Sequence, residues 1–463
     1  MIEQILSYIA TNKERYLNEL KSFLAIPSIS TTTENVSDVK RCAEWVANHL
    51  KNVGMANVKI MPTGGHPVVY ADWLGAPGKP TLLIYGHYDV QPVDPVDLWT
   101  YPPFEATIKG SKLFARGATD DKGQLFIHFK AIEAYLKNVG KLPINIKLLI
   151  EGEEEIGSKH LPKFVMENKK LLKADLIAIS DTSMFAEGVP SVCYGLRGLS
   201  YLQIDVVGPN RDLHSGSFGG TVHNPIQALS EIIAQLHDKN GKVNIPGFYD
   251  SVRPLTRKER QLYKELPWCD QRYARSLGVK ELYGEKGYST LERLWARPTL
   301  ECNGIWGGFI GDGAKTVLPS KASAKISMRL VPDQKAGRVA KLVEQYVKKI
   351  TPKTVSLSVR YLHGGEPAII SIESPGIQAA VVALQKGFGK KPLYQREGGS
   401  IPIVVQFKRI LGLDTVLFGF GLPYENAHAP DEFLNLNNFF GGIRAVAHYY
   451  NELPRYMVMK GNK

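Results

Sequence analysis

The sequence predicts an α/β fold in which a doubly wound domain is interrupted by a smaller inserted α+β domain. Three observations lead to this prediction. Short apolar runs alternate with amphipathic stretches over the first 180 residues or so. The pattern changes near residue 200 to strict apolar–polar alternation, and the first pattern returns after about residue 370. A chain of 463 residues is long enough to form two domains with cores of their own.

The N-terminal part alternates between strand and helix signals. Apolar runs at Thr81–Tyr85, Ile144–Ile150 and Leu176–Ile179 are typical of parallel strands that are covered on both faces. Apolar residues three or four apart predict helices over 2–24, 38–53, about 121–138 and about 158–172. Strand–helix–strand alternation of this kind is typical of a doubly wound parallel sheet.

The middle of the chain has a different pattern. Tyr201–Val207 and Ala322–Leu330 alternate apolar and polar residues, which predicts antiparallel strands buried on one face. Helices are predicted from Asn224-Pro225 onward and through 339–347, followed by a strand over 355–359. We therefore expect an α+β (ferredoxin-like) domain over 198–366, inserted between 1–197 and 367–463. Its segment 250–300 is rich in charged and aromatic residues, and its sequence does not indicate a function.

Composition excludes several classes of protein. The net charge of +12 is spread over the chain with no block of five Lys or Arg, so we expect no nucleic-acid partner. No apolar run reaches the ~18 residues of a membrane helix, and the first residues lack the features of a signal peptide. The four cysteines form no C-x-x-C pair, which favours reduced thiols and a cytoplasmic protein.

Histidine and acidic residues follow the predicted strands, where sites form in open α/β sheets. The first strand runs into Gly86-His87-Tyr88-Asp89, the second into Glu151–Glu155, and the third into Ser180-Asp181. Asp120-Asp121 precedes a predicted helix between the first two strands. Taken singly, each motif is as easily a surface pair, a solvated turn or a helix cap. Their occurrence at successive strand ends predicts one shared site.

Imidazole and carboxylate together are ligands for a catalytic divalent ion, of which zinc is a good candidate. One histidine with three sources of carboxylate exceeds what one ion needs, and suits two ions bridged by a carboxylate. Of two adjacent glutamates, one can bind metal while the other accepts a proton from water. The run Glu153–Glu155 leaves open which two these are. Asp89 is placed to orient the His87 imidazole.

Four motifs resemble the signature set of metallopeptidase family 20: GHYDVQP, GATDDKG, EGEEEIGS and RDLHSGSFGG. The stretches GAKTVLPSKASAKISMRLVP, HGGEP and REGGSIPI resemble its cytosolic nonspecific (carnosinase-like) dipeptidase branch. The resemblance covers both predicted domains in the family's order. It implies a zinc-peptidase-like catalytic domain and an inserted lid and dimerisation domain.

The resemblance also implies roles for individual residues. Two divalent ions are expected, zinc in preference to manganese or cobalt, with Glu154 as general base and Glu153 as a bystander. A cis peptide is implied between Asp120 and Asp121. The implied metal ligands are His87 and Asp181 for the first ion, Glu155 and His428 for the second, and Asp120 as the bridge between them.

The inserted domain is expected to hold the substrate. The family implies that His214 stabilises the oxyanion across a dimer interface and that Arg329 binds the substrate's terminal carboxylate. Further substrate contacts are implied for Thr316, His363, Gly399 and Ser400. These features predict a homodimeric dipeptidase acting on small peptides. The alternatives are an N-acyl amino-acid deacylase of the same family and a non-catalytic metal- or peptide-binding protein.

Overall fold

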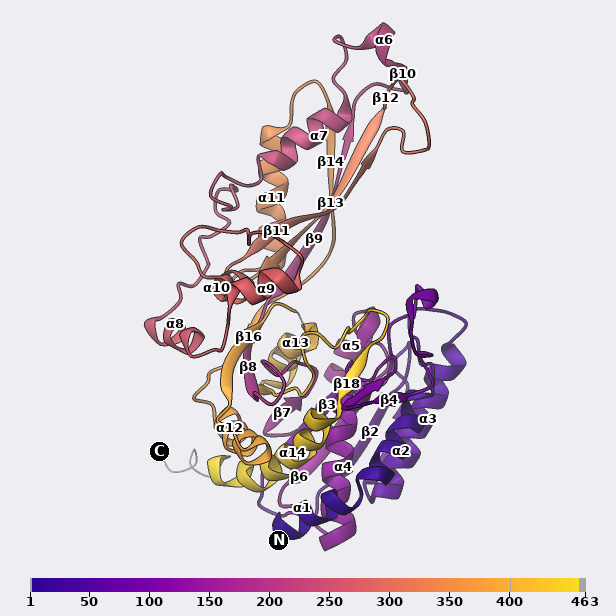
Figure 1. Cartoon of the computed structure of the whole chain (residues 1–463), viewed down its shortest axis with the longest axis vertical. Helices are drawn as coiled ribbons and strands as arrows, with labels where there is room; N and C mark the ends of the chain where they lie inside the picture. The colour runs from indigo at the N-terminus through magenta and orange to yellow at the C-terminus, as the bar shows by residue number, and fades with distance from the viewer. Residues whose placement is uncertain (1, 400, 458–463) are drawn as a thin grey trace. The chain divides into compact units, whose positions relative to one another are not determined.

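The chain forms two compact units in a computed structural model that describes residues 2–399 and 401–457 (Figure 1). The first unit comprises the residues up to Tyr194, Ile370–Gln395, and those from Ile403 onward. The second unit comprises Gly195–Ile369 and Arg396–Pro402. The short stretch 396–402, which the sequence analysis assigned to the flanking domain, thus clusters with the second unit.

A nine-stranded mixed sheet organises the first unit in the order β1-β2-β6-β3-β7-β17-β8-β15, with β16 pairing β8. Its central strands β6, β3, β7 and β17 are parallel to one another, so their carboxyl ends share one edge. Strand β15 and the last residues of β8 and β16 belong by sequence to the second unit. The strands are β1 (Ala56–Met61), β2 (Val68–Trp73), β3 (Thr81–His87), β6 (Asn145–Glu151), β7 (Leu176–Ile179), β8 (Ser191–Leu196), β15 (Ala368–Ile369), β16 (Leu393–Glu397) and β17 (Thr415–Leu417).

Helices and a small second sheet complete the first unit. The helices are α1 (Ile2–Thr11), α2 (Lys13–Leu24), α3 (Val36–Val53), α4 (Lys122–Val139), α5 (Leu161–Glu167), α12 (Pro375–Phe388), α13 (Pro402–Leu411) and α14 (Leu436–Met457). The small sheet joins β4 (Thr107–Lys109), β5 (Lys112–Phe114) and β18 (Phe433–Asn435), and short 3-10 turns occur at η1 (Val96–Leu98) and η2 (Glu154–Ile156).

The prediction of a single helix over 2–24 is wrong, because the helix is interrupted at Asn12, between α1 and α2. Its φ and ψ of −105° and 12° leave the helical region. The Asn12 side chain donates a hydrogen bond to the Tyr8 carbonyl at 2.8 Å. A short amide side chain that bonds to nearby backbone competes with the helix ladder in this way.

Consecutive residues of β3 show that the sheet is covered on both faces. The Tyr85 ring packs edge-on against Phe407 of α13, with ring centroids 5.3 Å apart. The next residue, Gly86, points the other way: a Cβ there would lie 2.9 Å from the side chain of Leu125 in α4. Because side chains alternate along a strand, α13 and α4 cover opposite faces of the sheet. This is the doubly wound arrangement that the sequence predicted.

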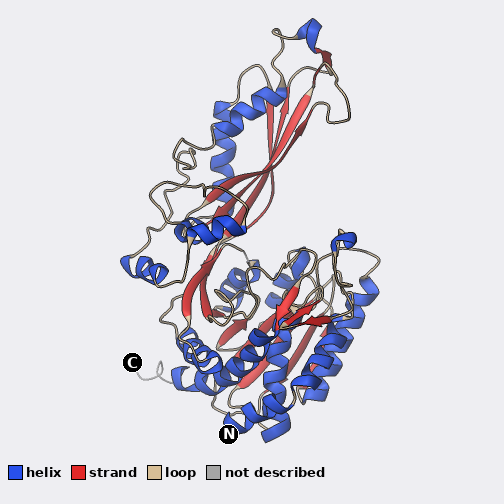
Figure 2. Ribbon diagram, in the orientation of Figure 1, coloured by secondary structure: helices blue, strands red, loops and turns tan. Residues whose placement is uncertain are grey.

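The second unit is built on a four-stranded antiparallel sheet in the order β11-β13-β9-β14. Figure 2 shows its two long helices lying along the sheet. The chain order strand–helix–strand–strand–helix–strand with this sheet order is the ferredoxin-like topology. The main elements are β9 (Gly198–Val207), α7 (Pro225–Ala234), β11 (Thr299–Gly307), β13 (Lys321–Leu330), α11 (Ala336–Ile350) and β14 (Ser356–Gly365).

Smaller elements lie at the two ends of this sheet. Figure 1 shows β10 and β12 at the end of the second unit opposite to α8, α9 and α10. They are β10 (Leu213–His214), α6 (Ser215–Phe218), α8 (Arg257–Lys264), α9 (Asp270–Ser276), α10 (Thr290–Trp295) and β12 (Val317–Leu318). The predicted insertion 250–300 therefore contains three short helices.

The two faces of β13 have different environments, as its alternating sequence predicted. Ile326 and Met328 are fully buried in the core that the sheet forms with α7 and α11. Lys325 on the opposite face is exposed and Arg329 is partly buried. None of the helices among residues 2–399 and 401–457 has both the length and the apolarity needed to cross a bilayer.

Candidate metal centre

The predicted ligands of the first unit follow the carboxyl ends of its parallel strands. His87 is the last residue of β3, and Asp181 follows the end of β7 after Ser180. Glu155 lies in the turn η2 just after β6, and His428 lies in the loop between β17 and β18. Asp120 precedes α4. The shared edge of the sheet brings these segments, far apart in sequence, to one place.

Asp120 stands between the two histidines. Its Oδ1 lies 3.1 Å from His87 Nε2, and its Oδ2 lies 2.9 Å from His428 Nε2. Asp181 Oδ2 is 3.9 Å from His87 Nε2, and Glu155 Oε2 is 3.3 Å from His428 Nε2. The Asp120–Asp121 peptide is cis, as the resemblance implied.

These residues make two groups that fit divalent ions. His87, Asp120 and Asp181 form one group, and Asp120, Glu155 and His428 form the other. Within each group the ligand atoms lie within 4.8 Å of one another. Each group has one imidazole and two carboxylates, a donor set that suits a catalytic ion with an open position. The two oxygens of Asp120 face different groups, as a bridging carboxylate requires.

Asp89 orients both sides of the centre. Its backbone carbonyl lies 3.1 Å from His87 Nδ1, and its Oδ1 lies 3.4 Å from the same nitrogen. The same carboxylate accepts the backbone N–H groups of Glu154 at 3.3 Å and Glu155 at 3.2 Å. Asp89 is fully buried. It therefore fixes the imidazole and the η2 turn relative to each other, with Nε2 left facing Asp120.

The three consecutive glutamates have different surroundings. Glu153 accepts the His66 backbone N–H at 3.0 Å and lies 2.9 Å from His160 Nδ1. Glu155 faces His428 and also accepts a hydrogen bond from Gln91 at 2.8 Å. Glu154 lies between them, where its carboxyl interacts with the charges of the centre. These contacts favour the assignment of Glu154 and Glu155, rather than Glu153, to the chemistry.

The charges of the centre favour the binding of cations. Burial raises the pKa of Glu154 to about 8, opposed by His87 and aided by the negative charges of Glu155 and Asp120. Burial and the charge of Asp120 also hold the pKa of Asp181 well above its ordinary value. Hydrogen bonds to Asp120 and Glu155 raise the pKa of His428 to about 10. Several acids in a small buried space repel one another, and bound cations would relieve that repulsion.

A buried carboxylate that the sequence analysis missed fixes the Asp120 loop. Glu432 is fully buried, and its Oε1 accepts the backbone N–H groups of Thr119 at 2.9 Å and Asp120 at 3.1 Å. Its Oε2 accepts Gly117 N–H at 2.9 Å and Arg116 Nη1–H at 2.8 Å. All four contacts converge on one side chain, so the loop before α4 is held rigidly.

Glu425 secures the loop that carries His428. Its carboxylate accepts backbone N–H groups of Leu422 at 2.9 Å and Asn435 at 2.7 Å, and the Thr119 hydroxyl at 2.6 Å. Burial raises the pKa of Glu425 to about 7. Nothing in the sequence around Glu425 or Glu432 separates them from exposed loop glutamates. The side-chain partners that hold them, Thr119 for Glu425 and Arg116 for Glu432, lie some 300 residues away in the chain.

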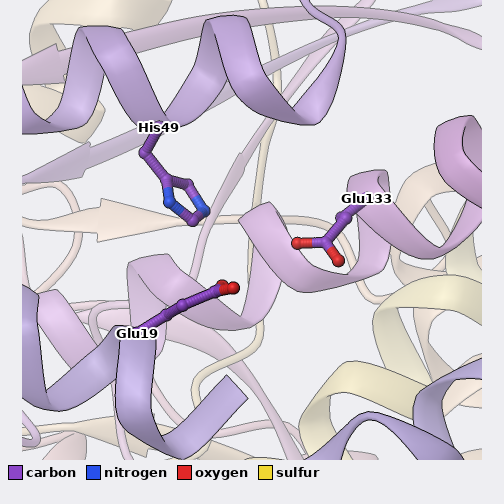
Figure 3. A group of neighbouring side chains, drawn as sticks. All are labelled: Glu19, His49 and Glu133. Carbon is purple, nitrogen blue, oxygen red and sulfur yellow. The ribbon is translucent and has the colours of Figure 1, made fainter. Parts of the chain in front are cut away.

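Among the described residues, a third group of candidate ligands lies apart from this centre. Glu19, His49 and Glu133 converge from α2, α3 and α4 (Figure 3). Arg15 and Lys130 each pair with both glutamates, with Lys130 Nζ 2.6 Å from Glu133. Two cations already balance the two carboxylates, so a divalent ion here would meet uncompensated repulsion. We interpret this group as an ion-pair network that ties α2 to α4.

The predicted substrate residues lie in the second unit, in two places. His214 pairs with Val317 across β10 and β12, and the Ser215 N–H donates to the Thr316 carbonyl at 3.0 Å. Arg329 and His363 belong instead to the main sheet, where the His363 ring stacks on Tyr201 with centroids 5.2 Å apart. Gly399 lies in the segment 396–402 of the same unit, and Ser400 lies outside the described residues.

Known proteins are similar to this chain in sequence and in fold. The sequence pattern described as Peptidase family M20/M25/M40 matches residues 83–452. The chain belongs to this family. A Cys-Gly metallodipeptidase, dug1, of Schizosaccharomyces pombe is 35% identical, and the match covers 98% of each chain. Human carnosine dipeptidase 1 superimposes with a TM-score of 0.86 at 32% identity, covering 98% of this chain and 99% of that one.

A further M20 structure, the metallo-carboxypeptidase Sso-CP2 from Sulfolobus solfataricus, has a TM-score of 0.84 and 35% identity. It covers 95% of this chain and 99% of its own. These likenesses confirm the predicted family and the predicted α/β fold class. M20 membership makes the chain a metallopeptidase, in agreement with the two candidate ligand groups.

We predict that Glu432→Gln weakens binding of Zn²⁺ by about 10–100-fold, the usual cost of losing a residue that positions a ligand. The amide would turn a donor toward backbone N–H groups that now meet an acceptor. The measurement is titration of metal-free protein against a competing chromogenic chelator. Glu452→Gln is the matched control, because Glu452 of α14 is also buried but pairs with Lys386 of α12. Equal affinity in both variants would contradict the role of Glu432.

Proposed function

We propose that this M20 peptidase hydrolyses dipeptides with a free C-terminal carboxylate, with two divalent ions held by the centre described above. The observation that carries the proposal is the sharing of Asp120 by two His–carboxylate groups, with Glu154 beside them. Relatives named as metallodipeptidases and the full-length match to carnosine dipeptidase 1 support the substrate class. They give no support to the alternative, an N-acyl amino-acid deacylase.

The residues of the centre suit zinc, with manganese or cobalt as alternatives, because imidazole and carboxylate ligands accept all three. His87, Asp120 and Asp181 would hold one ion, and Asp120, Glu155 and His428 the other. When bound, the two ions would polarise the scissile carbonyl and lower the pKa of a water molecule at the site.

Glu154 supplies the proton transfer in this proposal. Its carboxylate accepts a proton from the attacking water and returns it to the amine nitrogen of the leaving amino acid. Its backbone N–H is held by Asp89, which also holds the His87 imidazole. Base and metal ligands are therefore fixed by one buried carboxylate, so that their spacing does not depend on the substrate.

We assign substrate binding to the second unit. Arg329 would bind the terminal carboxylate of the peptide, since a guanidinium matches a carboxylate with two parallel hydrogen bonds. His363, Thr316, Gly399 and Ser400 would make further contacts, and His214 would stabilise the oxyanion. The free thiols of Cys42, Cys193, Cys269 and Cys302 support a reducing, cytoplasmic location.

The distance between His214 and Arg329 argues for two copies of the chain at each site. Asp212, beside His214, accepts the Ser320 N–H at 2.8 Å, and Ser320 precedes the first residue of β13. Arg329 is at the other end of the same strand. At ~3.3 Å per residue, roughly 25 Å of strand separates these ends, far more than a dipeptide spans. A second copy would let His214 of one chain serve the site of the other.

Exposed features of the second unit support a homodimer formed there. Strand β11 is an edge of the main sheet, and open edges are normally paired or protected. Trp306 at its end is 44% exposed, and Phe309 and Ile310 in the following loop are 46% and 90% exposed. Apolar side chains gathered beside an open edge suit burial against a second copy of the same surface.

We predict that protein reconstituted with Zn²⁺ or Mn²⁺ cleaves unblocked dipeptides and leaves N-acetyl and N-succinyl amino acids nearly untouched. The reason is that relatives matched over nearly their full length are named as dipeptidases; Arg329 does not separate the two panels, because both carry a free carboxylate. The measurement is release of free amino acid from both panels at equal concentration. Faster release from the N-acyl panel would favour the deacylase alternative.

We predict that Glu154→Gln binds both ions normally and loses about 10²–10⁴-fold in kcat, because an amide cannot accept the proton. Metal content and turnover are measured on the same sample. Glu153→Gln is the matched control, since Glu153 faces His160, and it should stay within a few-fold of the unmodified enzyme. If Glu153→Gln proves inactive and Glu154→Gln active, the assignment of the base is wrong.

We predict that inactive His214→Ala and inactive Glu154→Gln chains restore activity when they exchange subunits. A mixed dimer would contain one site with both residues and one with neither, so it should have roughly half the activity of an unmodified dimer. Loss of an oxyanion donor costs ~10²–10³ in rate, which makes the recovery easy to detect. Confirmed exchange without recovery would mean that His214 does not act across subunits.

A further inference from the structure

Helix α4 carries a buried histidine, His128, roughly two turns into the helix that follows Asp120 and Asp121. His128 lies outside the motif GATDDKG, which ends at Gly123, and it belongs to neither ligand group of the metal centre. A polar ring buried in the core needs partners for both of its nitrogens. The partners of His128 connect α4 to the residue that precedes Asp181.

Both nitrogens of His128 meet a hydroxyl group. Nε2 lies 2.7 Å from Ser180 Oγ, and Nδ1 lies 3.2 Å from the hydroxyl oxygen of Tyr450 on α14. Ser180 immediately precedes the candidate ligand Asp181, and both Ser180 and Tyr450 are buried. The imidazole therefore lies between α14 and the strand end that presents Asp181.

The direction of these hydrogen bonds follows from their last acceptor. The Ser180 hydroxyl donates to the Phe418 carbonyl oxygen, 3.1 Å away, which can only accept. With that proton used, Ser180 Oγ accepts a hydrogen bond from His128 Nε2–H. Burial lowers the pKa of His128 to about 3, so the ring is neutral and its Nδ1 is an acceptor. Burial also holds the pKa of Tyr450 well above its ordinary value, so its hydroxyl keeps a proton and donates to Nδ1.

Asp181 is held on its other side as well. Thr182 Oγ1 accepts the backbone N–H of Gly419 at 2.9 Å. A Cβ at Gly419 would lie 1.7 Å from the Thr182 carbonyl oxygen, so the close approach of these two segments requires glycine. The residues before and after Asp181 are thus both bonded to the chain just after β17, and His128 adds a support from α4.

These bonds concern one of the two ligand groups. Asp181 belongs to the group that faces one oxygen of the bridging aspartate, and it is not a member of the other group. The other group has supports of its own. Asp89 accepts a backbone N–H of the η2 turn, and Glu425 secures the loop that carries His428. A change at His128 should therefore affect the binding of one ion and not of the other.

We propose that His128 positions Asp181 through Ser180 and so sets the affinity of the centre for one of its two ions. The ion concerned is the one that His87, Asp120 and Asp181 would hold. With Nε2–H bonded to Ser180, the backbone before Asp181 keeps one position, and its carboxylate faces His87 before an ion binds. His128 is a positioning residue and not a ligand. The inference rests on the two-ion centre of the proposed function and deepens it.

Two single-ion proteins test this role without any turnover. His428→Ala keeps the group that contains Asp181, and His87→Ala keeps the other group. Each metal-free protein is titrated with Zn²⁺ against a competing chromogenic chelator. Adding His128→Phe, which fills the space of the imidazole but has no donor, should weaken Zn²⁺ binding about 10–100-fold in the His428→Ala protein. It should leave the affinity of the His87→Ala protein unchanged. His128→Gln should cost less, because its amide can still donate to Ser180.

Tyr135→Phe is the matched control, because Tyr135 is also buried on α4 and donates to the Ala447 carbonyl of α14 at 2.9 Å. It should leave the affinity of both single-ion proteins unchanged. Equal losses in the two proteins with His128→Phe, or losses as large with Tyr135→Phe, would show a general effect of packing and overturn the proposal. An unchanged affinity in the His428→Ala protein would overturn it as well.

A second variant serves if His128→Phe does not fold. Ser180→Ala removes the acceptor of the Nε2–H bond, so it should weaken the same ion, and an unchanged affinity would contradict the role of His128. The outcome also separates this role from the proposed function. If the loss is confined to one ion but the unmodified enzyme cleaves no dipeptide, the proposed substrate class fails and the role of His128 stands. If dipeptides are cleaved and both ions are weakened equally, only the role of His128 fails.

Discussion

The hydrogen bonds of the Glu432 carboxylate are the constraint on which the centre depends. Burying a charge is expensive unless it is paired and fully hydrogen-bonded, and this carboxylate meets both conditions through Arg116 and three backbone N–H groups. Its donors come from the loop that presents Asp120, while Glu432 itself lies just beyond the loop that presents His428. One side chain therefore links the bridging ligand to a ligand from the far end of the sequence. Asp89 provides a second link, between His87 and the turn that carries Glu155.

The parallel strands explain why so many acids can be kept in one small space. Each acidic segment starts from the carboxyl end of a strand whose neighbours run in the same direction, so its backbone position is set by the sheet. The buried Asp89 then joins the segment after β3 to the segment after β6. The fold itself therefore imposes the burial, and the repulsion added to it, that raise the pKa of Asp181 and Glu154. Such a site is organised before cations arrive, which lowers the cost of binding them.

The sequence could predict those strands and site residues that are marked by apolar periodicity or by their position at the end of a strand. Local patterns predict the strands at Thr81 and Leu176 and the alternation of β13. They also predict that His87 and Asp181 lie at or just after strand ends. The break at Asn12 was missed because one amide–carbonyl bond outweighs an otherwise continuous apolar stripe. Glu432 was missed for a different reason: its partners are brought to it by the whole fold, and an acidic residue before Phe433 has no local mark of burial. The ligand role of His428 was predicted only from the family resemblance, because its loop has no apolar periodicity from which a position could be inferred.

The second unit contains a cavity of about 590 Å³ that was beyond sequence analysis for the same physical reason. The apolar–polar alternation of β13 predicts which of its residues face away from the core. Arg329 could therefore be placed on a polar face from its neighbours in the sequence alone. What lies opposite that face is set by the 250–300 segment, whose three short helices are too brief and too polar to show a periodic stripe. Arg197 stands between two strands, and only the pairing of Leu199 with Arg329 puts its guanidinium group beside that of Arg329. Between Leu196 and Gly198, Arg197 has no local pattern that would indicate this neighbour.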